Sequence, residues 1–381
     1  MPNFSGVWNL KDQVQAAAAY RWPGAVPPQR LYAWGAGSFG KLGDGSTINH
    51  SSPVQVGALI DWSEASTGQF HSVALKIDGT LWTWGRNNAG QLGDGTNIDL
   101  SSPVQVGALT TWNKIAAGGS HTVSLKTDGT LWTWGLNSSG QLGNGTVASR
   151  SSPVQVGALT TWNKIAAGGS HTVAVKTDGT LWSWGFNSSD GPLGHNNLVS
   201  KSSPVQVGAL TTWNEITAGI YQTAAIKTDG TLWTWGRNNT GQLGDNTVIN
   251  RSSPVQVGAM TNWSKIAAGS NQFLSIKTDG TLWAWGANSS GQIGDGTVVN
   301  KSSPVQVGAL TTWLQIAGIT TSSAAIKTDG TLWTWGFNGN GELGDGTTVY
   351  KSSPVQVGAL TTWFRVANSS RAPHIIAITK G

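Results

Sequence analysis

Short alternating runs of hydrophobic and polar residues, separated by Gly, Asn, Asp and Pro, repeat along most of this chain. Typical runs are TVSLK and TLWTWG, and none of them has the long apolar periodicity of a helix. Such alternation is typical of half-buried β-strands. Asp128-Gly129 lies between the two runs, where a glycine with positive φ lets the chain reverse, so residues 122 to 135 are predicted to form a β-hairpin.

The whole unit occurs seven times, with a period of about fifty residues. Two phrases mark it, TDGTLWTWG or a close variant and SSPVQVG. Periods of this length indicate blades, solenoid turns or arrays, and the short strands favour an all-β unit. The tryptophan of the closing Trp-Gly and the first serine of SSPVQVG recur at Trp34, Trp84, Trp134, Trp184, Trp235, Trp285 and Trp335, and at Ser51, Ser101, Ser151, Ser202, Ser252, Ser302 and Ser352.

The two ends of the chain lack complementary parts of this unit. Residues 31–35, LYAWG, match the second strand of the hairpin without its partner, and residues 374–381, HIIAITKG, match the first strand without its continuation. Pairing them would complete a seventh hairpin and remove the exposed edges of an open array. We therefore predict an all-β fold, a seven-bladed β-propeller over residues 31–381, closed by pairing of the C-terminal strand with the N-terminal strand.

Tryptophan is frequent, with 22 residues in the chain. Trp82 and Trp84 are two apart on one strand and face the same side, so we predict that both pack between neighbouring sheets. A sugar-stacking role for some tryptophans stays open. The third tryptophan of the unit, in TTWNKI, is expected to be the more exposed one.

Composition limits the classes of function. Charged residues make up 11% of the chain, against about 25% in a typical domain, and the net charge is +5. The basic residues form no run of the kind found in nucleic-acid-binding arms, so no specific nucleic-acid partner is expected. The sequence has no cysteine, no apolar stretch long enough for a membrane span and no secretory signal pattern, so we expect no disulfide and no membrane span.

Residues 1–30 do not belong to the repeat. Asn9 is a possible helix cap and LKDQVQAAAAYRW has good helix formers before Pro23, so a short helical extension is predicted. An apolar stripe on this segment indicates either a cap on the propeller or an anchor to a partner. The predicted anchor residues are Phe4, Trp8, Leu10, Val14 and Trp22.

The repeats, with GQLGDGT, SSPVQV and HTVSLKTDGTLWTWG, resemble the regulator of chromosome condensation repeat family over residues 31–381. The resemblance implies seven four-stranded blades and an interaction platform. The founding type of the family is a guanine-nucleotide exchange factor for a small GTPase that also binds nucleosomes. In the exchange factors dissimilar blade loops contact the GTPase, whereas here the blades are nearly copies.

The N-terminal segment PNFSGVWNLKDQVQAAAAYRWP has a separate resemblance, to the start of many tail-fibre and other virion proteins of bacteriophages. It covers less than a tenth of the chain. The resemblance implies an attachment segment fused to a displayed domain, with other virion proteins as its partners.

Differences between the copies fall in three loops, and recognition residues usually lie in loops on a rigid scaffold. One loop follows Trp-Gly. In the second loop, five of the seven units have a cation before SSP, which predicts a crescent of positive charge able to bind an anionic partner. The alternative is that these side chains only solvate the loop and protect edge strands. The five cations are Arg150, Lys201, Arg251, Lys301 and Lys351.

The third loop changes from GGSH in early units to GIYQ, GSNQ, GITT and NSSRAPH in later ones. We predict that Tyr221, Asn271, Gln272 and Arg371 are exposed there and suit glycan or protein recognition. Drift in a tolerant loop is an equal alternative. Histidines occupy matching positions at the end of this loop, but blades separate them and no carboxylate repeats nearby, so no metal site is predicted. They are His71, His121, His171 and His374.

The sequence shows no nucleophile with its base, no phosphate loop and no paired carboxylates set apart from the repeat, so we expect no catalytic residues, no cofactor and no enzyme activity. The leading hypothesis is a structural protein of a phage virion, located in the virion, whose N-terminal segment contacts other virion proteins. Its propeller would bind a host-surface glycan or protein. The alternatives are a cellular protein-interaction propeller such as a small-GTPase regulator, or a secreted lectin.

Overall fold

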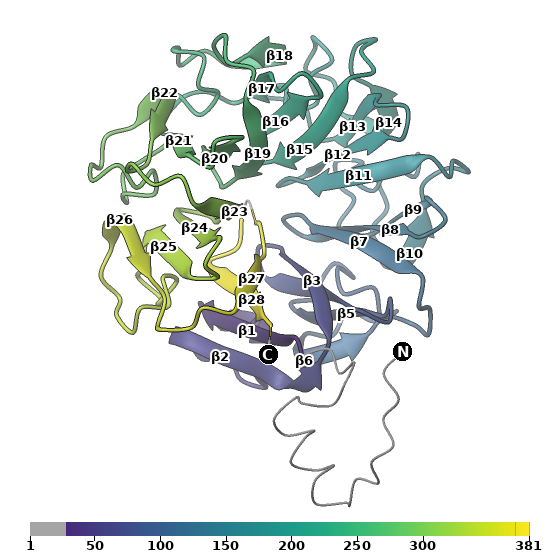
Figure 1. The fold of residues 1–381 in the computed structure, drawn as a ribbon. Coiled ribbons are helices and arrows are strands. Elements are labelled where there is room, and N and C mark those ends of the chain that lie inside the picture. The colour runs from purple at the N-terminus through teal and green to yellow at the C-terminus, as the bar shows by residue number, and fades with distance from the viewer. Residues whose placement is uncertain (1–27, 370, 381) are drawn as a thin grey trace, which may run out of the picture.

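Seven four-stranded antiparallel sheets surround a central axis in the computed structural model, which describes residues 28–369 and 371–380 (Figure 1). Each sheet is one blade, with its first strand beside the axis and its fourth strand at the periphery. The seven-bladed propeller predicted from the repeats is therefore confirmed. Blade one contains β3 (Trp62–Thr67), β4 (His71–Lys76), β5 (Leu81–Gly85) and β6 (Leu100–Gln105).

Blades two to six repeat the same order with nearly the same strand lengths. Their strands are β7 (Trp112–Ala117), β8 (His121–Lys126), β9 (Leu131–Gly135) and β10 (Arg150–Gln155); β11 (Trp162–Ala167), β12 (His171–Lys176), β13 (Leu181–Gly185) and β14 (Lys201–Gln206); β15 (Trp213–Ala218), β16 (Gln222–Lys227), β17 (Leu232–Gly236) and β18 (Arg251–Gln256); β19 (Trp263–Ala268), β20 (Gln272–Lys277), β21 (Leu282–Gly286) and β22 (Lys301–Gln306); and β23 (Trp313–Gly318), β24 (Ser322–Lys327), β25 (Leu332–Gly336) and β26 (Lys351–Gln356). The hairpin predicted at residues 122–135 is formed by β8 and β9.

Blade seven combines both ends of the propeller, in the order β2 (His50–Ile60), β1 (Arg30–Gly35), β28 (His374–Thr379) and β27 (Trp363–Val366). Strand β1 pairs with β28 over six residue pairs, from Arg30 opposite Thr379 to Gly35 opposite His374. A short 3-10 helix, η1 (Ser38–Gly40), follows β1. The predicted closure is therefore confirmed.

Each hydrophobic cluster lies between two successive blades. The cluster that contains Trp84 also contains Leu31 of blade seven, and the indole Nε1 of Trp84 donates to the carbonyl of Lys41 in blade seven at 2.9 Å. The third tryptophan of each unit is buried, because it packs against two other aromatic rings of its blade, as Trp62 does against Trp82 and Trp84; Trp62 is 0% exposed. Its predicted exposure is therefore wrong. The half-buried aromatic residue of each blade is the one at the position of Trp82.

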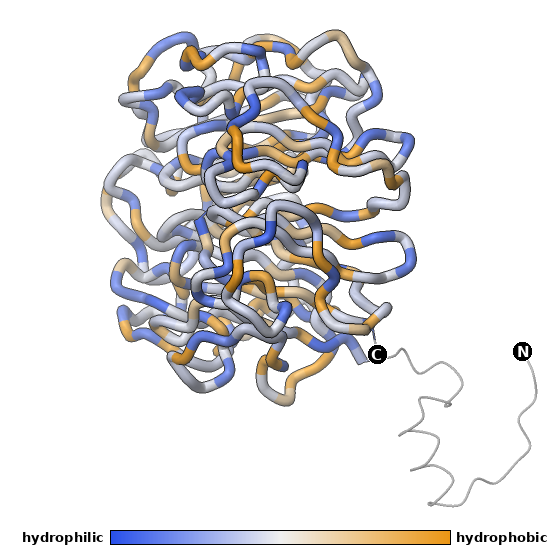
Figure 2. The backbone as a smooth tube through the Cα atoms, turned by 90° about the vertical axis from the view of Figure 1, so that its left-hand side faces the viewer, coloured by the Kyte–Doolittle hydropathy of each residue, from blue (hydrophilic) through white to orange (hydrophobic). Residues whose placement is uncertain are grey.

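Hydrophobic residues also reach the outer loops (Figure 2). Ile98 is 67% exposed and Val147 is 63% exposed. None of the helices in the described part of the chain is long and apolar enough to cross a membrane. The predicted N-terminal helix, and the anchor residues Phe4, Trp8, Leu10, Val14 and Trp22, lie outside the described residues.

Candidate binding face

Two kinds of loop meet on one face of the ring. In every blade the strands alternate in direction, so the loop between the first and second strands and the loop between the third and fourth strands emerge at the same end. In blade one these are residues 68–70 and 86–99. We call the face formed by these loops the loop face.

One aromatic and cationic cluster lies on the loop face where blades seven and one meet. The rings of Phe39 and Phe70 stand edge to face with centroids 5.2 Å apart. The Arg86 guanidinium carbon lies 4.7 Å from the centroid of Phe39 and 5.4 Å from that of Phe70. Phe39 is 39% exposed. We call these three residues the Phe70 cluster.

A buried lysine lies beneath this cluster. The Lys41 ammonium lies 5.2 Å from the centroid of Phe70 and donates to the Ser38 hydroxyl at 2.9 Å. Lys41 is 0% exposed, and burial lowers its pKa to about 8 despite the opposing attraction of the Glu342 carboxylate. The lysine therefore adds positive charge close to these aromatic rings.

A second cluster lies where blades three and four meet. The rings of Phe186 and Tyr221 are 5.7 Å apart, and the Arg237 guanidinium carbon lies 4.0 Å from the centroid of Tyr221. Arg237 also forms a 2.9 Å ion pair with Asp190, which in turn accepts a hydrogen bond from Asn250 at 2.9 Å. The Asp190 carboxylate therefore fixes the position of this arginine. We call Phe186, Tyr221 and Arg237 the Tyr221 cluster.

The two clusters use the same positions of the blade. Phe70 and Tyr221 both immediately precede the second strand, and Arg86 and Arg237 both immediately follow the third. No other blade combines an aromatic residue with an arginine at these positions; the corresponding pairs are Ser120 and Leu136, Ser170 and Phe186, Asn271 and Ala287, Thr321 and Phe337, and Pro373 and Ala36.

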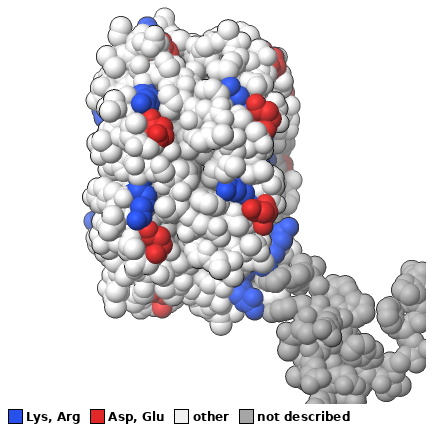
Figure 3. Space-filling model, turned by 60° about the vertical axis from the view of Figure 1, so that its left-hand side comes forward, with Lys and Arg blue, Asp and Glu red and all other residues white. Residues whose placement is uncertain are grey.

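The predicted cationic crescent is largely neutralised. Arg251 and Lys301 each form a 3.0 Å ion pair with the aspartate of the preceding GD turn, and Lys351 lies 3.9 Å from Asp345. On the outer surface, basic side chains lie beside acidic ones (Figure 3). Arg150 and Lys201 form no ion pair with a described residue, because Asn144 and His195 replace the aspartate in their units. Of the five predicted crescent cations, those without an ion pair thus lie in blades two and three.

The residues predicted in the third loop have different surroundings. Tyr221 is half-buried within its cluster, and Asn271 is also half-buried. Gln272 is 0% exposed, because its amide donates to the carbonyl oxygens of Ile319 and Ser322, so its predicted exposure is wrong. Half-buried Arg371 reaches across the ring, with Nη1 lying 3.2 Å from where a Cβ of Gly119 would be.

The four matching histidines form bridges between blades. The Nε2 atom of His71 lies 3.0 Å from the hydroxyl of Thr122, which donates its own proton to the carbonyl of Gln91. The hydroxyl must therefore accept from His71, so Nε2 carries a proton. The buried Nδ1 has no partner in the described structure, and burial keeps the imidazole neutral. Burial lowers the pKa of His71 to about 3 and that of His121 to about 4. His121, His171 and His374 make the same bridge. Among the described residues, no group of three or more His, Cys, Asp or Glu side chains has the arrangement of a metal site.

The fold is that of a seven-bladed propeller with an asymmetric loop face. The family model described as an RCC1-like domain matches residues 30–378, so this chain belongs to the RCC1-like domain family.

Solved structures at low sequence identity have the same fold. Yeast RCC1 (Prp20) bound to Kap60 is 21% identical, with a TM-score of 0.82, and the match covers 93% of this chain and 90% of that one. Prp20p from Saccharomyces cerevisiae, described with its binding to Gsp1p and histones, is 21% identical with a TM-score of 0.83 and coverages of 93% and 92%. Human WBSCR16 is 20% identical with a TM-score of 0.82 and coverages of 93% and 99%.

Sequence reasoning identified the loop positions but missed Phe39, Phe70 and the role of Arg86 and Arg237. A signal was available, since aligning the seven copies shows an aromatic residue before the second strand and an arginine after the third strand only in units one and four. The contribution of Phe39 from the neighbouring blade needed the structure.

Proposed function

We propose that this chain is a non-enzymatic protein-interaction propeller that binds a partner protein through its loop face. The observation that supports the proposal is the pair of aromatic and arginine clusters in blades one and four. Nearly identical blades otherwise surround them, so these clusters are specific departures from a repeated scaffold. Aromatic residues and arginine are enriched in the energetic centres of protein interfaces.

A small GTPase is the first partner class to test. The chain belongs to the RCC1-like domain family, and the yeast relative Prp20p is described with its binding to Gsp1p, a GTPase. The two clusters give this propeller two separated contact points on one face. Such a surface suits a folded globular partner better than a short peptide.

The test is a nucleotide-release assay. Small GTPases loaded with a fluorescent GDP analogue are mixed with the propeller, and release is compared with that caused by the Phe70→Ala/Arg86→Ala variant. We expect faster release with the wild-type protein and a loss of at least about tenfold in the variant. A panel in which neither release nor binding responds to the propeller would rule out this partner class.

The virion interpretation stays a separate prediction. It rests on residues 1–24, whereas the family match begins at residue 30, and no comparison supports it. We propose mass spectrometry of density-purified phage particles from the source sample, comparing the full chain with one lacking residues 1–24. Particles without the protein would contradict a virion location. A glycan array tests the third interpretation, a secreted lectin.

A further inference from the structure

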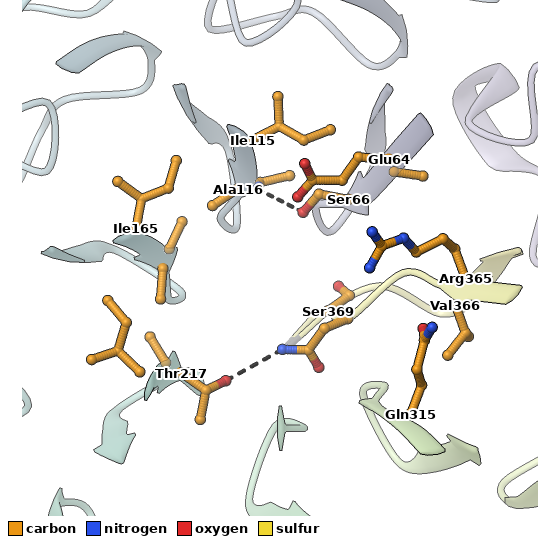
Figure 4. Close-up of a pocket in the computed structure, with 17 residues that line it drawn as sticks. Glu64, Ser66, Ile115, Ala116, Ile165, Thr217, Gln315, Arg365, Val366 and Ser369 are labelled. Carbon is orange, nitrogen blue, oxygen red and sulfur yellow. Dashed lines mark hydrogen bonds between the residues drawn. The ribbon is translucent and has the colours of Figure 1, made fainter. Parts of the chain in front are cut away.

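The centre of the ring contains a cavity of about 230 Å³, lined by the first strands of six blades (Figure 4). Its walls include small side chains such as Ala116 and Ala166, so open space remains along the axis. Polar groups project into it from blades one, four, six and seven (Figure 4). Small-molecule sites have this form, a concave space with a few convergent polar groups.

The chain closes this cavity at the loop face. After β27 it turns inward toward the centre of the ring (Figure 1). The Asn368 amide donates to the Thr217 hydroxyl of blade four at 3.3 Å, and the amide N–H of Ser369 donates to the carbonyl of Gly318 in blade six at 2.9 Å. The side chain of Arg371 lies beside Gly119 of blade two. The cavity is therefore a well that is closed at the loop face and has the exposed side chain of Arg365 near its other end.

The well offers hydroxyl donors that have no acceptor. Ser66 accepts from the N–H of Ala117 at 2.9 Å, Thr217 from the N–H of Ala268 at 3.1 Å, and Ser369 from the N–H of Ala372 at 2.9 Å. Because backbone N–H groups occupy their oxygens, each hydroxyl proton is left to donate, and none donates to a described residue. All three side chains are at least nine-tenths buried; Ser66, Thr217 and Ser369 are 8%, 2% and 3% exposed.

A ring of polar residues, all but one of them charged, surrounds the well at the third position of each first strand. Most of these side chains reach the next blade: Lys114 donates to the carbonyl of Asn163 at 2.6 Å, and Lys164 pairs with Glu215. Arg365 differs, because its guanidinium points toward the axis and makes no hydrogen bond or ion pair with a described residue (Figure 4). The ring has two more cations than carboxylates; its members are Glu64, Lys114, Lys164, Glu215, Lys265, Gln315 and Arg365.

We propose that this well binds a compact oxyanion, a small carboxylate or a phosphate, with Arg365 holding the anionic group and the free hydroxyls of Ser66, Thr217 and Ser369 donating to its other oxygens. A planar guanidinium matches both groups through two parallel hydrogen bonds. Unused donors inside a closed well select an acceptor-rich ligand, because a ligand without acceptors would leave them unsatisfied. The cavity volume restricts the ligand to a small molecule. This site is independent of the partner surface on the loop face.

The test is isothermal titration calorimetry of the full chain with inorganic phosphate and with succinate. Succinamide is the uncharged analogue of succinate. We expect saturable binding of at least one anion and none of succinamide. Arg365→Gln should weaken binding about ten- to a hundredfold. Glutamine is compatible with the fold at this position, because Gln315 occupies it in blade six.

Arg150→Gln is the matched control, since it removes the same charge from the outer rim, far from the well. It should leave binding unchanged. Equal weakening by both variants would show nonspecific attraction and overturn the proposal, as would binding of succinamide or the absence of binding by both anions. Phosphate binding alone, or succinate binding alone, identifies which oxyanion the well accepts.

Glu64 gives a second readout. Its carboxyl faces Arg365 of β27 and Lys114 of β7 and accepts the N–H of Ile115, and burial raises its pKa to about 7. Above that pH its negative charge opposes a bound anion, so binding of succinate, which is already largely a dianion at pH 6, should weaken as pH rises from 6 to 8. Glu64→Gln should remove this dependence. A pH profile that is the same in wild type and variant would show that the anion binds elsewhere.

Discussion

The residue that begins the second strand of each blade determines how neighbouring blades connect near the axis. In blades one to three it is a neutral histidine that donates to a hydroxyl of the next blade. In blades four and five it is Gln222 or Gln272, which donates to carbonyl oxygens of the next blade. The sequence indicated matching histidines but not their role, because the partner hydroxyl lies a whole unit away along the chain.

Acid should destabilise the propeller through these histidines. Their pKa is lower in the folded chain than the ordinary value of 6.5, about 4 for His121 and about 3 for His171. The unfolded chain therefore binds more protons as pH falls below 6.5, and the free energy of unfolding decreases, by roughly 2 kcal/mol per histidine at pH 5. Urea unfolding at pH 7.5 and pH 5 measures this decrease. In the His121→Gln/His171→Gln variant the free energy of unfolding should decrease less than in the wild type, by about twice the value for one histidine. An equal decrease in the free energy of unfolding in both proteins would contradict this explanation.

Each hairpin ends in a buried tryptophan. Two of them, Trp134 and Trp285, form a matched pair for testing one hydrogen bond. Trp134 donates its indole N–H to the carbonyl of Gln91 at 3.0 Å. In blade five Phe273 replaces the usual threonine and packs on Trp285, whose buried Nε1 has no partner in the described structure. Trp134→Phe should therefore reduce the free energy of unfolding by about 1 kcal/mol more than Trp285→Phe, since both substitutions remove the same ring volume. Denaturant unfolding measures the difference; equal losses would show that the indole bond contributes nothing.

At the scale of elements, the hairpins and the closure could be predicted from the sequence, because alternation and Asp-Gly turns are local signals and the two incomplete ends complement each other. The exposure of the tryptophans could not. Whether Trp62 or Trp82 is buried depends on which strand lies nearest the axis and on how neighbouring sheets overlap, and neither is encoded within one unit.

The closing strand pair should stabilise the ring, and two circular permutants test this. Both join β28 to β1 through an Asp-Gly turn in place of residues 1–29. One opens the chain between Ala209 and Leu210, between blades, and the other opens it at the Asp229-Gly230 turn inside blade four. Only in the second permutant does one blade, blade four, combine strands from the two ends of the permuted chain. Its free energy of unfolding should therefore exceed that of the first permutant by roughly 3 kcal/mol or more. A more stable first permutant would contradict the importance of the closing pair.

At the scale of the whole molecule, near-perfect repetition makes departures from it informative. The cations before SSP were predicted to form a crescent of positive charge. In the structure, aspartates of the same loops pair with Arg251, Lys301 and Lys351. The Phe70 and Tyr221 clusters are assembled from adjacent blades, so no single unit reveals them. Their shared face, with two contact points on one rigid ring, is the basis of the proposed partner binding.

The most direct test compares the two faces of the ring with one bound partner. Isothermal titration of a responding small GTPase would use the wild-type chain, a loop-face variant, Phe70→Ala/Tyr221→Ala, and an opposite-face control, Leu109→Ala/Leu159→Ala, whose side chains are each 47% exposed. We expect the loop-face variant to bind at least about tenfold more weakly and the control to bind as the wild type does. Weaker binding by the control, with the loop-face variant unchanged, would contradict the account.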